Sequence, residues 1–329
     1  MTVHDSNIDR LLAAFAHEKL DRVPNFEILI DPRSVSHLLG RRTNETLWTL
    51  PPAEARRVAE AVGQDAIACS LTWMHTPEGS VLTDADADRI SPPDPAEARA
   101  KVEAYLDALD GGGVGLCARL SSPLTLTYMT TGPVPIESFM MLLYDNRPLV
   151  ERLMDLYLEY HLRVIEAVKD LPYHFYYIGD DLSSSTGPLI SPTMLAELWA
   201  PRAERLVKAA LATDRPVLFH CCGAQAPILP YLVDWGVQAA HPVQPAANDI
   251  YQVHAAYGDK LTLVGNIDVA GALSFGTAEA VRAETREHID RLAGDGGYVV
   301  GSSHSIIDSV IPENYLAMVE ATHEYGRYA

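Results

Sequence analysis

Positively charged residues are scarce in this chain, and this scarcity argues against nucleic acids and membranes as partners. The 329 residues include 25 Lys and Arg against 44 Asp and Glu, for a formal net charge of −19 at pH 7. Such an acidic surface repels phosphate backbones and anionic lipid, so neither nucleic acid nor a membrane is an expected partner. No apolar run approaches the roughly 20 residues that span a bilayer, and the N-terminus lacks the apolar core of a signal peptide. We therefore expect a cytoplasmic protein.

Cysteine is also scarce, with four residues at Cys69, Cys117, Cys221 and Cys222. Two of them are adjacent, and the set does not resemble a disulfide framework. For Cys69 and Cys117 we expect packing in the core. In a reducing compartment, clustered cysteine beside histidine indicates metal binding or catalysis before it indicates cross-linking.

The glycine-rich first turn of a dinucleotide-binding fold is missing, and short apolar segments alternate with segments of helical period instead. Buried strands are predicted at 23–29, 65–73, 114–120, 174–181, 216–222, 239–244, 261–268 and 298–303. Helices are predicted from Asp145 to about 170, at 192–213 after Ser191, at 277–293 from Thr277, and from Pro312 onward. Strands separated by helices indicate parallel pairing through crossovers. Eight strands in one unit predict a single (β/α)8 TIM-type barrel domain over residues 1–329.

Polar residues recur at the C-terminal ends of the predicted strands, where barrels of this kind place their functional side chains. These residues are Glu27, His75, Arg119, Asp180, Asp181, His220, Cys222, His241, Gln244, Asn266, Asp268 and His304. Ordinary core strands would not end in polar residues so consistently. We expect them to form a ring around one pocket.

The densest part of this ring is the segment LFHCCG at 218–223. Positions i and i+2 of a strand face the same side, so His220 and Cys222 can point together into the barrel while Cys221 faces the helices. An imidazole and a thiolate on one face form half of a zinc site, and His304 can supply a third ligand. Three protein ligands leave the open position of a catalytic zinc. The alternatives are a buried cysteine pair with a hydrogen-bonded histidine, and His304 as an active-site histidine without metal.

Several segments together resemble the uroporphyrinogen decarboxylase superfamily, which includes zinc-dependent, corrinoid-linked methyltransferases. They are DRVPNFEILID at 21–31, GDDLSSSTGPLISP at 179–192, RPVLFHCCGAQAPILPYLVDWGVQAAHPVQP at 215–245, LTLVGNID at 261–268 and YVVGSSHSIIDSVIPENYLAMVEA at 298–321. The resemblance covers most of the chain and implies the same barrel as the strand count.

Departures from the pattern separate the branches of the superfamily. The decarboxylases share an N-terminal Arg-Gln-Ala-Gly-Arg segment that grips substrate carboxylates, where this chain has IDPRSVSHLLGRR and keeps at most Arg33 and the pair Arg41–Arg42. The methyltransferases carry His-x-Cys and a later Cys as zinc ligands. Here His220 and Cys222 match the first part, and His304 stands at the position of the later Cys. The decarboxylases also resemble this chain in having a histidine there, which keeps a metal-free reaction open.

The resemblance implies a zinc-dependent methyltransferase that moves a methyl group between a small substrate and a corrinoid (cobalamin) on a partner protein. Zinc held by two imidazoles and one thiolate has a net charge of about +1, which favours polarising a substrate oxygen, as in O-demethylation of a methyl ether. The alternatives are a decarboxylase-like lyase without metal, and a non-catalytic corrinoid- or tetrapyrrole-binding protein. Asp180, Asp181 and Glu27 are the candidate catalytic acids. The candidate substrate-binding residues are Arg119, His241, Gln244 and Asn266.

Overall fold

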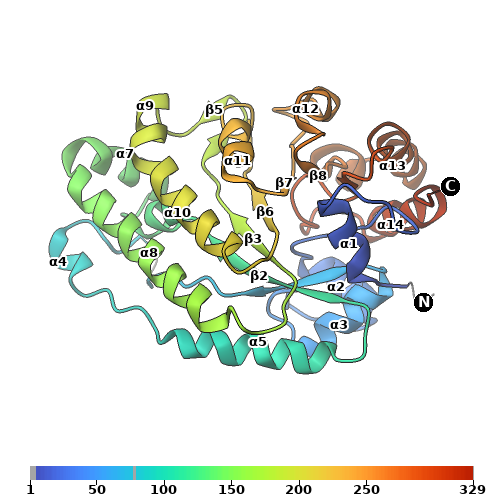
Figure 1. Cartoon of the computed structure of the whole chain (residues 1–329), viewed down its shortest axis with the longest axis horizontal. Coiled ribbons are helices and arrows are strands. Elements are labelled where there is room, and N and C mark those ends of the chain that lie inside the picture. Colours follow the sequence, from blue (N-terminus) through green and yellow to red (C-terminus); the bar gives the residue numbers. More distant parts are fainter. Residues whose placement is uncertain (1–4, 77–78, 329) are drawn as a thin grey trace.

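Seven parallel strands form a curled sheet at the centre of this computed structural model, which describes residues 5–76 and 79–328 (Figure 1). In spatial order they are β1 (Ala66–Ser70), β2 (Gly115–Ser121), β3 (Phe175–Gly179), β6 (Val217–His220), β7 (Ala239–His241), β8 (Thr262–Val264) and β9 (Tyr298–Val299). Each lies within or overlaps a segment that the sequence predicts as a strand. Two further short strands, β4 (Ser183–Ser184) and β5 (Gly187–Pro188), form a small antiparallel hairpin after β3.

The predicted strand at 23–29 is present only as an extended segment that makes isolated bridges. On one side the amide of Phe26 donates to the carbonyl of Val300 at 3.0 Å, and on the other the amide of Asp65 donates to the carbonyl of Asn25 at 3.2 Å. The segment therefore lies between β9 and β1 and closes the barrel. A continuous ladder does not form because Pro24 has no N–H and the amide of Asn25 donates to the Asp65 carboxylate instead.

Helices follow the strands and form the outer layer, as Figure 1 shows for α5, α8 and α10. The N-terminal helices are α1 (Ile8–Phe15), α2 (Pro32–Leu39), α3 (Pro52–Ala61) and α4 (Asp84–Ala87). The later ones are α5 (Pro95–Leu109), α6 (Pro123–Thr130), α7 (Pro135–Asp145), α8 (Arg147–Val168), α9 (Pro192–Met194), α10 (Ala200–Leu211), α11 (Leu229–Trp235), α12 (Ile250–Tyr257), α13 (Ala278–Leu292) and α14 (Pro312–Tyr325). Single π-helical turns occupy Leu195–Trp199 and Val269–Leu273. Within the described residues, no helix combines the length and the apolar character needed to cross a membrane.

Side-chain caps start several of these helices where the sequence predicts them. The Ser191 hydroxyl accepts from the amide of Met194, and the Thr277 hydroxyl accepts from the amide of Ala280. The prediction of Asp145 as a cap is wrong, because Asp145 is the last residue of α7. Asn146 caps α8 instead, with its side-chain oxygen accepting from the amide of Leu149 at 3.3 Å.

The barrel interior is a separate apolar cluster from the layer between sheet and helices, and helix α1 closes its N-terminal end. Leu11, Ala14 and Phe15 of α1 are at most 4% exposed and belong to the interior cluster. The ring of Phe15 meets that of Phe175 edge-on, with ring centroids 5.3 Å apart. Cys117 points into this interior and Cys69 packs in the outer layer, both fully buried. Functional side chains are thus confined to the opposite, C-terminal end.

Candidate metal centre

Three neighbouring strand ends bring the central side chains of the site together. β3 ends at Gly179, which pairs with His220 at the end of β6, and the amide of Asp180 donates to the His220 carbonyl at 2.8 Å. On the other side His220 pairs with His241 at the end of β7. The residues just beyond β3 and β6, Asp181 and Cys222, therefore project from adjacent positions at one end of the barrel.

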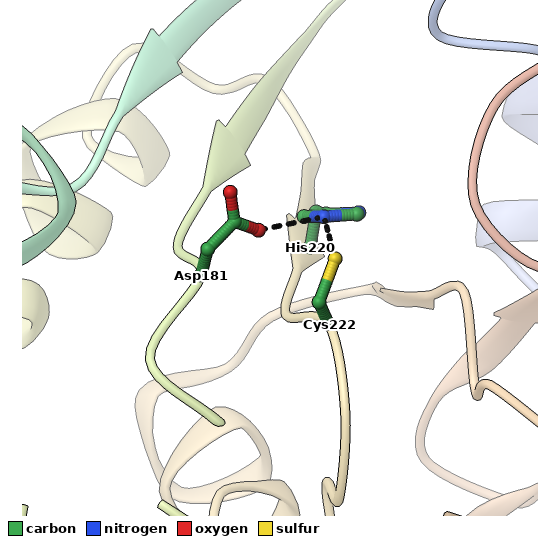
Figure 2. Close-up of side chains that lie close together, drawn as sticks. All are labelled: Asp181, His220 and Cys222. Carbon is green, nitrogen blue, oxygen red and sulfur yellow. Dashed lines mark hydrogen bonds and ion pairs between the residues drawn. The ribbon is translucent and has the colours of Figure 1, made fainter. Parts of the chain in front are cut away.

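A carboxylate, an imidazole and a thiol converge at this point (Figure 2). His220 Nε2 lies 3.2 Å from Asp181 Oδ1 and 3.2 Å from Cys222 Sγ. One ligand atom from each of the three residues lies within 4.8 Å of the others, and the described residues hold no second group of this kind. Nitrogen, sulfur and carboxylate oxygen are the three ligand types that zinc takes in proteins. The donor set therefore fits zinc.

The other ring nitrogen of His220 is held by His241. The two Nδ1 atoms lie 2.6 Å apart, so His220 donates through Nδ1–H when its Nε2 is free to act as a ligand. His241 is fully buried, and burial together with the charges of His220 and His304 lowers the pKa of His241 well below its usual value. A neutral His241 accepts this hydrogen bond through its own Nδ1, which fixes both the tautomer and the orientation of His220.

The pKa values of Asp181 and Cys222 are shifted in opposite directions. Burial alone would raise the pKa of Asp181, but hydrogen bonds from His220 and Cys222 and the charge of His304 lower the pKa below its usual value. Burial and the neighbouring Asp181 charge raise the pKa of the Cys222 thiol. Two anions at this distance repel each other, and a cation between them is the arrangement that lets both ionise. The pair is therefore able to hold a divalent metal, and without one the Cys222 thiol stays protonated beside the Asp181 carboxylate.

The adjacent cysteines point to different places, as strand alternation predicts. Cys222 Sγ lies against His220, whereas Cys221 is fully buried and its Sγ–H donates to the Cys222 carbonyl at 3.2 Å. Burial raises the pKa of the Cys221 thiol, which faces Ser183 and Leu182 rather than the cluster.

His304 adjoins the cluster but does not belong to the group of converging ligand atoms. Its ring is perpendicular to that of His220 with centroids 6.2 Å apart, and its Nδ1 is buried without a hydrogen-bond partner. Asp181 takes the third position at which the sequence predicts His304. Asp181 shares the strand parity of Tyr177, which lies in the barrel interior, so alternation continued past Gly179 would have indicated its direction.

Asp180 faces away from Asp181, toward the helices. Its carboxylate accepts from the Thr125 hydroxyl at 2.8 Å and from the indole of Trp199 at 2.5 Å. Burial raises the pKa of Asp180 to about 7, against the hydrogen bonds from Ser122, Trp199 and Thr125 that lower it. The same Thr125 hydroxyl accepts from the amide of Asp181 at 2.9 Å. Asp180 thus helps to hold Thr125, which contacts Asp181, and the structure does not bring Asp180 itself into the cluster, where the sequence predicts it as a catalytic acid.

Glu27 also lies apart from the cluster. Its neighbours Phe26 and Ile28 belong to the barrel interior, so Glu27 points outward, where its carboxylate accepts from the amide and hydroxyl of Ser302 at 2.6 and 2.7 Å. Burial raises the pKa of Glu27 to about 8, although the Ser302 hydrogen bonds oppose the shift. These contacts join the first segment of the barrel to the last, and the structure does not bring Glu27, a predicted catalytic acid, into the cluster.

Of the predicted substrate-binding residues, some lie at the cluster and others lie outside it. Gln244 accepts from the amide of Gly223 at 2.7 Å, and Asn266 accepts from His288 Nε2 at 2.8 Å, so both brace loops outside the cluster. His241 contacts His220, and Arg119 lies on β2 at the same end of the barrel.

The sequence analysis does not single out two aromatic residues, Tyr177 beside the cluster and Trp48 against Arg119. The ring of Tyr177, on β3, lies 5.6 Å from that of His220, and Trp48 stacks on the guanidinium of Arg119 at 4.0 Å. Tyr177 had a usable signal, since it shares the strand parity of Gly179, whereas Trp48 lies in a loop without period.

Residues 57–325 match the family described as Uroporphyrinogen decarboxylase (URO-D). A uroporphyrinogen decarboxylase of Methylococcus capsulatus is 28% identical over 255 residues, which cover 74% of this chain and 69% of that protein. The methylcobamide:CoM methyltransferase MtaA of Methanosarcina barkeri is 25% identical over 236 residues, which cover 69% of this chain and 65% of that protein. A solved structure of a methyltransferase from Methanosarcina mazei has a TM-score of 0.72 at 19% identity, covering 98% of this chain and 99% of that one.

The first curated relatives are matched over only 24% to 69% of their own lengths. They include both decarboxylases and a methyltransferase, so sequence similarity alone leaves the reaction open. The structural likeness shows the fold and confirms the TIM-type barrel predicted from the alternation of strands and helices.

Proposed function

We propose, from the premise that this chain belongs to the uroporphyrinogen decarboxylase (URO-D) family, that it is a zinc-dependent methyltransferase working with a corrinoid. The observation that carries the proposal is the convergence of Asp181, His220 and Cys222. A reaction that only moves protons needs no thiol, whereas a thiol beside an imidazole and a carboxylate is a zinc donor set.

Different residues of the chain would bind the metal and position its ligands in such a zinc site. His220 and Cys222 would hold the metal, with Asp181 as third ligand, and His241 keeps the His220 ring in place. Zinc, when bound, supplies a Lewis acid that stabilises negative charge on a substrate sulfur or oxygen. The methyl carrier would be cobalamin, free or on a partner protein, and the reaction would take place in the cytoplasm.

The identity of the third zinc ligand, Asp181 or His304, affects which class of substrate the centre would favour. With His304 as ligand the centre would have a charge of about +1, but two anionic ligands, Asp181 and Cys222, reduce it to about zero. The charge argument for a methyl ether thereby weakens, and a small thiol or its methyl derivative becomes equally suited. The relatives include a methylated-thiol–coenzyme M methyltransferase of Methanosarcina mazei, 22% identical over 269 residues. We propose a small methyl thioether, thiol or methyl ether as substrate.

The second candidate is a decarboxylase-like lyase without metal. The buried Nδ1 of His304, which has no hydrogen-bond partner, and the ionised Asp181 favour it, since an imidazole and a carboxylate could act as acid and base in a proton transfer. Asp180, which that reaction would also use, is engaged by Thr125 and Trp199 on the far side of the strand. The lyase is therefore left with one of its two proposed aspartates.

Metal content and methyl transfer together test the proposal. We expect about one zinc per chain, and demethylation of methylcobalamin by a small thiol that is abolished by a chelator and restored by zinc. The readout is the visible spectrum of the corrinoid. Methyl transfer that is unchanged after zinc removal would contradict the role of zinc. A protein with neither zinc nor methyl transfer would support the lyase class, and tight cobalamin binding without turnover would support a non-catalytic binding protein.

Paired variants at Asp181 and His304 test the identity of the third ligand. Asp181→Ala should weaken zinc binding by at least about 100-fold, more than the loss of a residue that only supports a ligand. His304→Ala should weaken it by less than about 10-fold, because His304 lies outside the converging atoms. Competition with a chromophoric chelator measures both affinities. A larger loss of zinc affinity in His304→Ala than in Asp181→Ala would show that His304, and not Asp181, is the third zinc ligand.

A further inference from the structure

The backbone just beyond β3 is held by a threonine hydroxyl. Strand β3 ends at Gly179, and the next amide, that of Asp180, still donates to the His220 carbonyl of β6 at 2.8 Å. The amide of Asp181 donates instead to the Thr125 hydroxyl of α6 at 2.9 Å. Thr125 therefore replaces the neighbouring strand as hydrogen-bond partner at the position where the sheet stops.

The same hydroxyl also binds the side chain of the other aspartate. It donates to Asp180 Oδ1 at 2.8 Å while its oxygen accepts from the Asp181 amide. A hydroxyl carries one proton, so donation to the carboxylate leaves the lone pairs of the oxygen free for that amide. Thr125 is only 6% exposed, which limits competition from water for both bonds.

The second carboxylate oxygen of Asp180 is held by Trp199. The indole N–H of Trp199 donates to Asp180 Oδ2 at 2.5 Å, and both side chains are fully buried. Trp199 is the last residue of the π-helical turn Leu195–Trp199, in which the Ala200 amide donates to the carbonyl of Leu195, five residues back. Such turns are rare and frequent at functional sites. Here the turn ends at the residue that reaches Asp180.

These bonds bear on which of two adjacent carboxylates reaches the candidate metal centre. Asp180 has one oxygen on Thr125 and the other on Trp199, so its carboxylate is kept on the helix side of the sheet. Side chains alternate along an extended chain, and the next side chain then faces the barrel interior. Asp181 Oδ1 accordingly lies 3.2 Å from His220 Nε2. Holding Asp180 outward therefore keeps Asp181 inward.

We propose that Thr125 and Trp199 are positioning residues of the candidate metal centre. By holding Asp180 they make Asp181, and not Asp180, the carboxylate that a metal meets beside His220. Both act through Asp181 and are not ligands themselves. The effect on a metal rests on the proposed function, whereas the position of Asp181 rests on the hydrogen bonds of Thr125 and Trp199.

The first test measures metal binding after removal of the bridging hydroxyl. Thr125→Val keeps the branched shape and should weaken zinc binding about 10–100-fold, the effect of losing a residue that orients a metal ligand. Thr125→Ser restores the hydroxyl and should bind zinc as the wild type does. Chelator competition gives the affinities. The visible spectrum of the cobalt(II) form should change in Thr125→Val and not in Thr125→Ser, because it reports the ligands around the metal.

The matched control is Thr127→Val, in the same helix. Thr127 is fully buried, and its hydroxyl donates to the carbonyl of Pro123 at 2.8 Å, so the variant removes the same atoms without touching the loop after β3. It should keep the zinc affinity and the cobalt spectrum, with thermal unfolding as a check on the fold. Equal losses in Thr125→Val and Thr127→Val, or no loss in Thr125→Val, would overturn the inference.

Trp199→Phe tests the other donor, because it keeps an aromatic ring and removes the indole N–H. Zinc affinity should fall about 10-fold, at the lower end of the range for a supporting residue, since Thr125 still holds Asp180. The cobalt(II) spectrum should shift in the same direction as in Thr125→Val. An unchanged affinity and spectrum would exclude Trp199 as a positioning residue.

Metal-free protein separates this inference from the proposed function. Hydrogen exchange of the Asp181 amide, resolved by NMR, should be at least about 10-fold faster in Thr125→Val than in the wild type, and unchanged in Thr125→Ser and Thr127→Val. If exchange follows this pattern while the wild type binds no zinc, the positioning role stands and the zinc proposal fails. If zinc binds and Thr125→Val changes neither exchange nor affinity, the zinc proposal stands and this inference fails.

Discussion

Cys222→Ser will deprive the protein of most of its zinc, whereas Cys221→Ser will leave the zinc content unchanged. The two cysteines are neighbours in sequence, but only Cys222 Sγ lies against His220, at 3.2 Å. A serine hydroxyl stays protonated at neutral pH and is a much poorer zinc ligand than a thiolate. We expect the affinity of the Cys222 variant for zinc to fall by at least about 100-fold, beyond the effect of losing a supporting residue.

Metal content per chain, measured after exchange into metal-free buffer, provides the readout, and the affinity follows from chelator competition. Cys221→Ser is a demanding control because the Cys221 side chain is fully buried, so any general damage to the fold would appear there first. Equal loss of zinc in both variants would mean that the fold and not a ligand had been removed. No loss in either would exclude Cys222 as a ligand.

Glu27→Gln will make the protein more stable than the wild type at alkaline pH and leave it nearly unchanged at acidic pH. Burial raises the pKa of Glu27 from 4.5 to about 8. Between these two values the folded protein binds more protons than the unfolded chain, so wild-type stability falls as the pH rises through this window. Glutamine has the same shape, can accept from the Ser302 amide and donate to its hydroxyl, and does not titrate.

The difference in the free energy of unfolding should grow from near zero at pH 5 to as much as about 4 kcal/mol at pH 9. Urea unfolding of the metal-free protein at both pH values measures it. Glu204→Gln, at an exposed position of α10, is the control and should follow the wild type throughout. A constant difference between Glu27→Gln and wild type at both pH values would contradict the raised pKa.

The sequence predicted those features that depend on periodicity. Seven of the eight predicted strands are present, and alternation correctly separated the directions of Cys221 and Cys222. The eighth, at 23–29, lost its regular pairing because Pro24 removes a donor and Asp65 takes the amide of Asn25. A strand pattern in the sequence carries no information about such competition from a side chain elsewhere in the chain.

The site was less predictable because its residues depend on direction and not only on position. Asp180 and Asp181 both follow β3, yet one bonds Trp199 in the helix layer and the other meets His220. Glu27 was noticed as a buried acid, but its place between Phe26 and Ile28 already implied that it points away from the barrel interior. The partner of each acid comes from a distant segment, and one sequence does not show which segment that is.

Helix α1, which seals the N-terminal end of the barrel with Leu11, Ala14 and Phe15, has a consequence for the order of events in the reaction. Because the N-terminal end is closed, a molecule can reach and leave His220 only through the C-terminal end of the barrel. Under the proposed function, a small substrate would have to bind before a corrinoid covers the open end of the barrel, and its product would leave only after the corrinoid has dissociated. The proposed function thus implies an ordered mechanism, in which the small substrate binds first and its product leaves last.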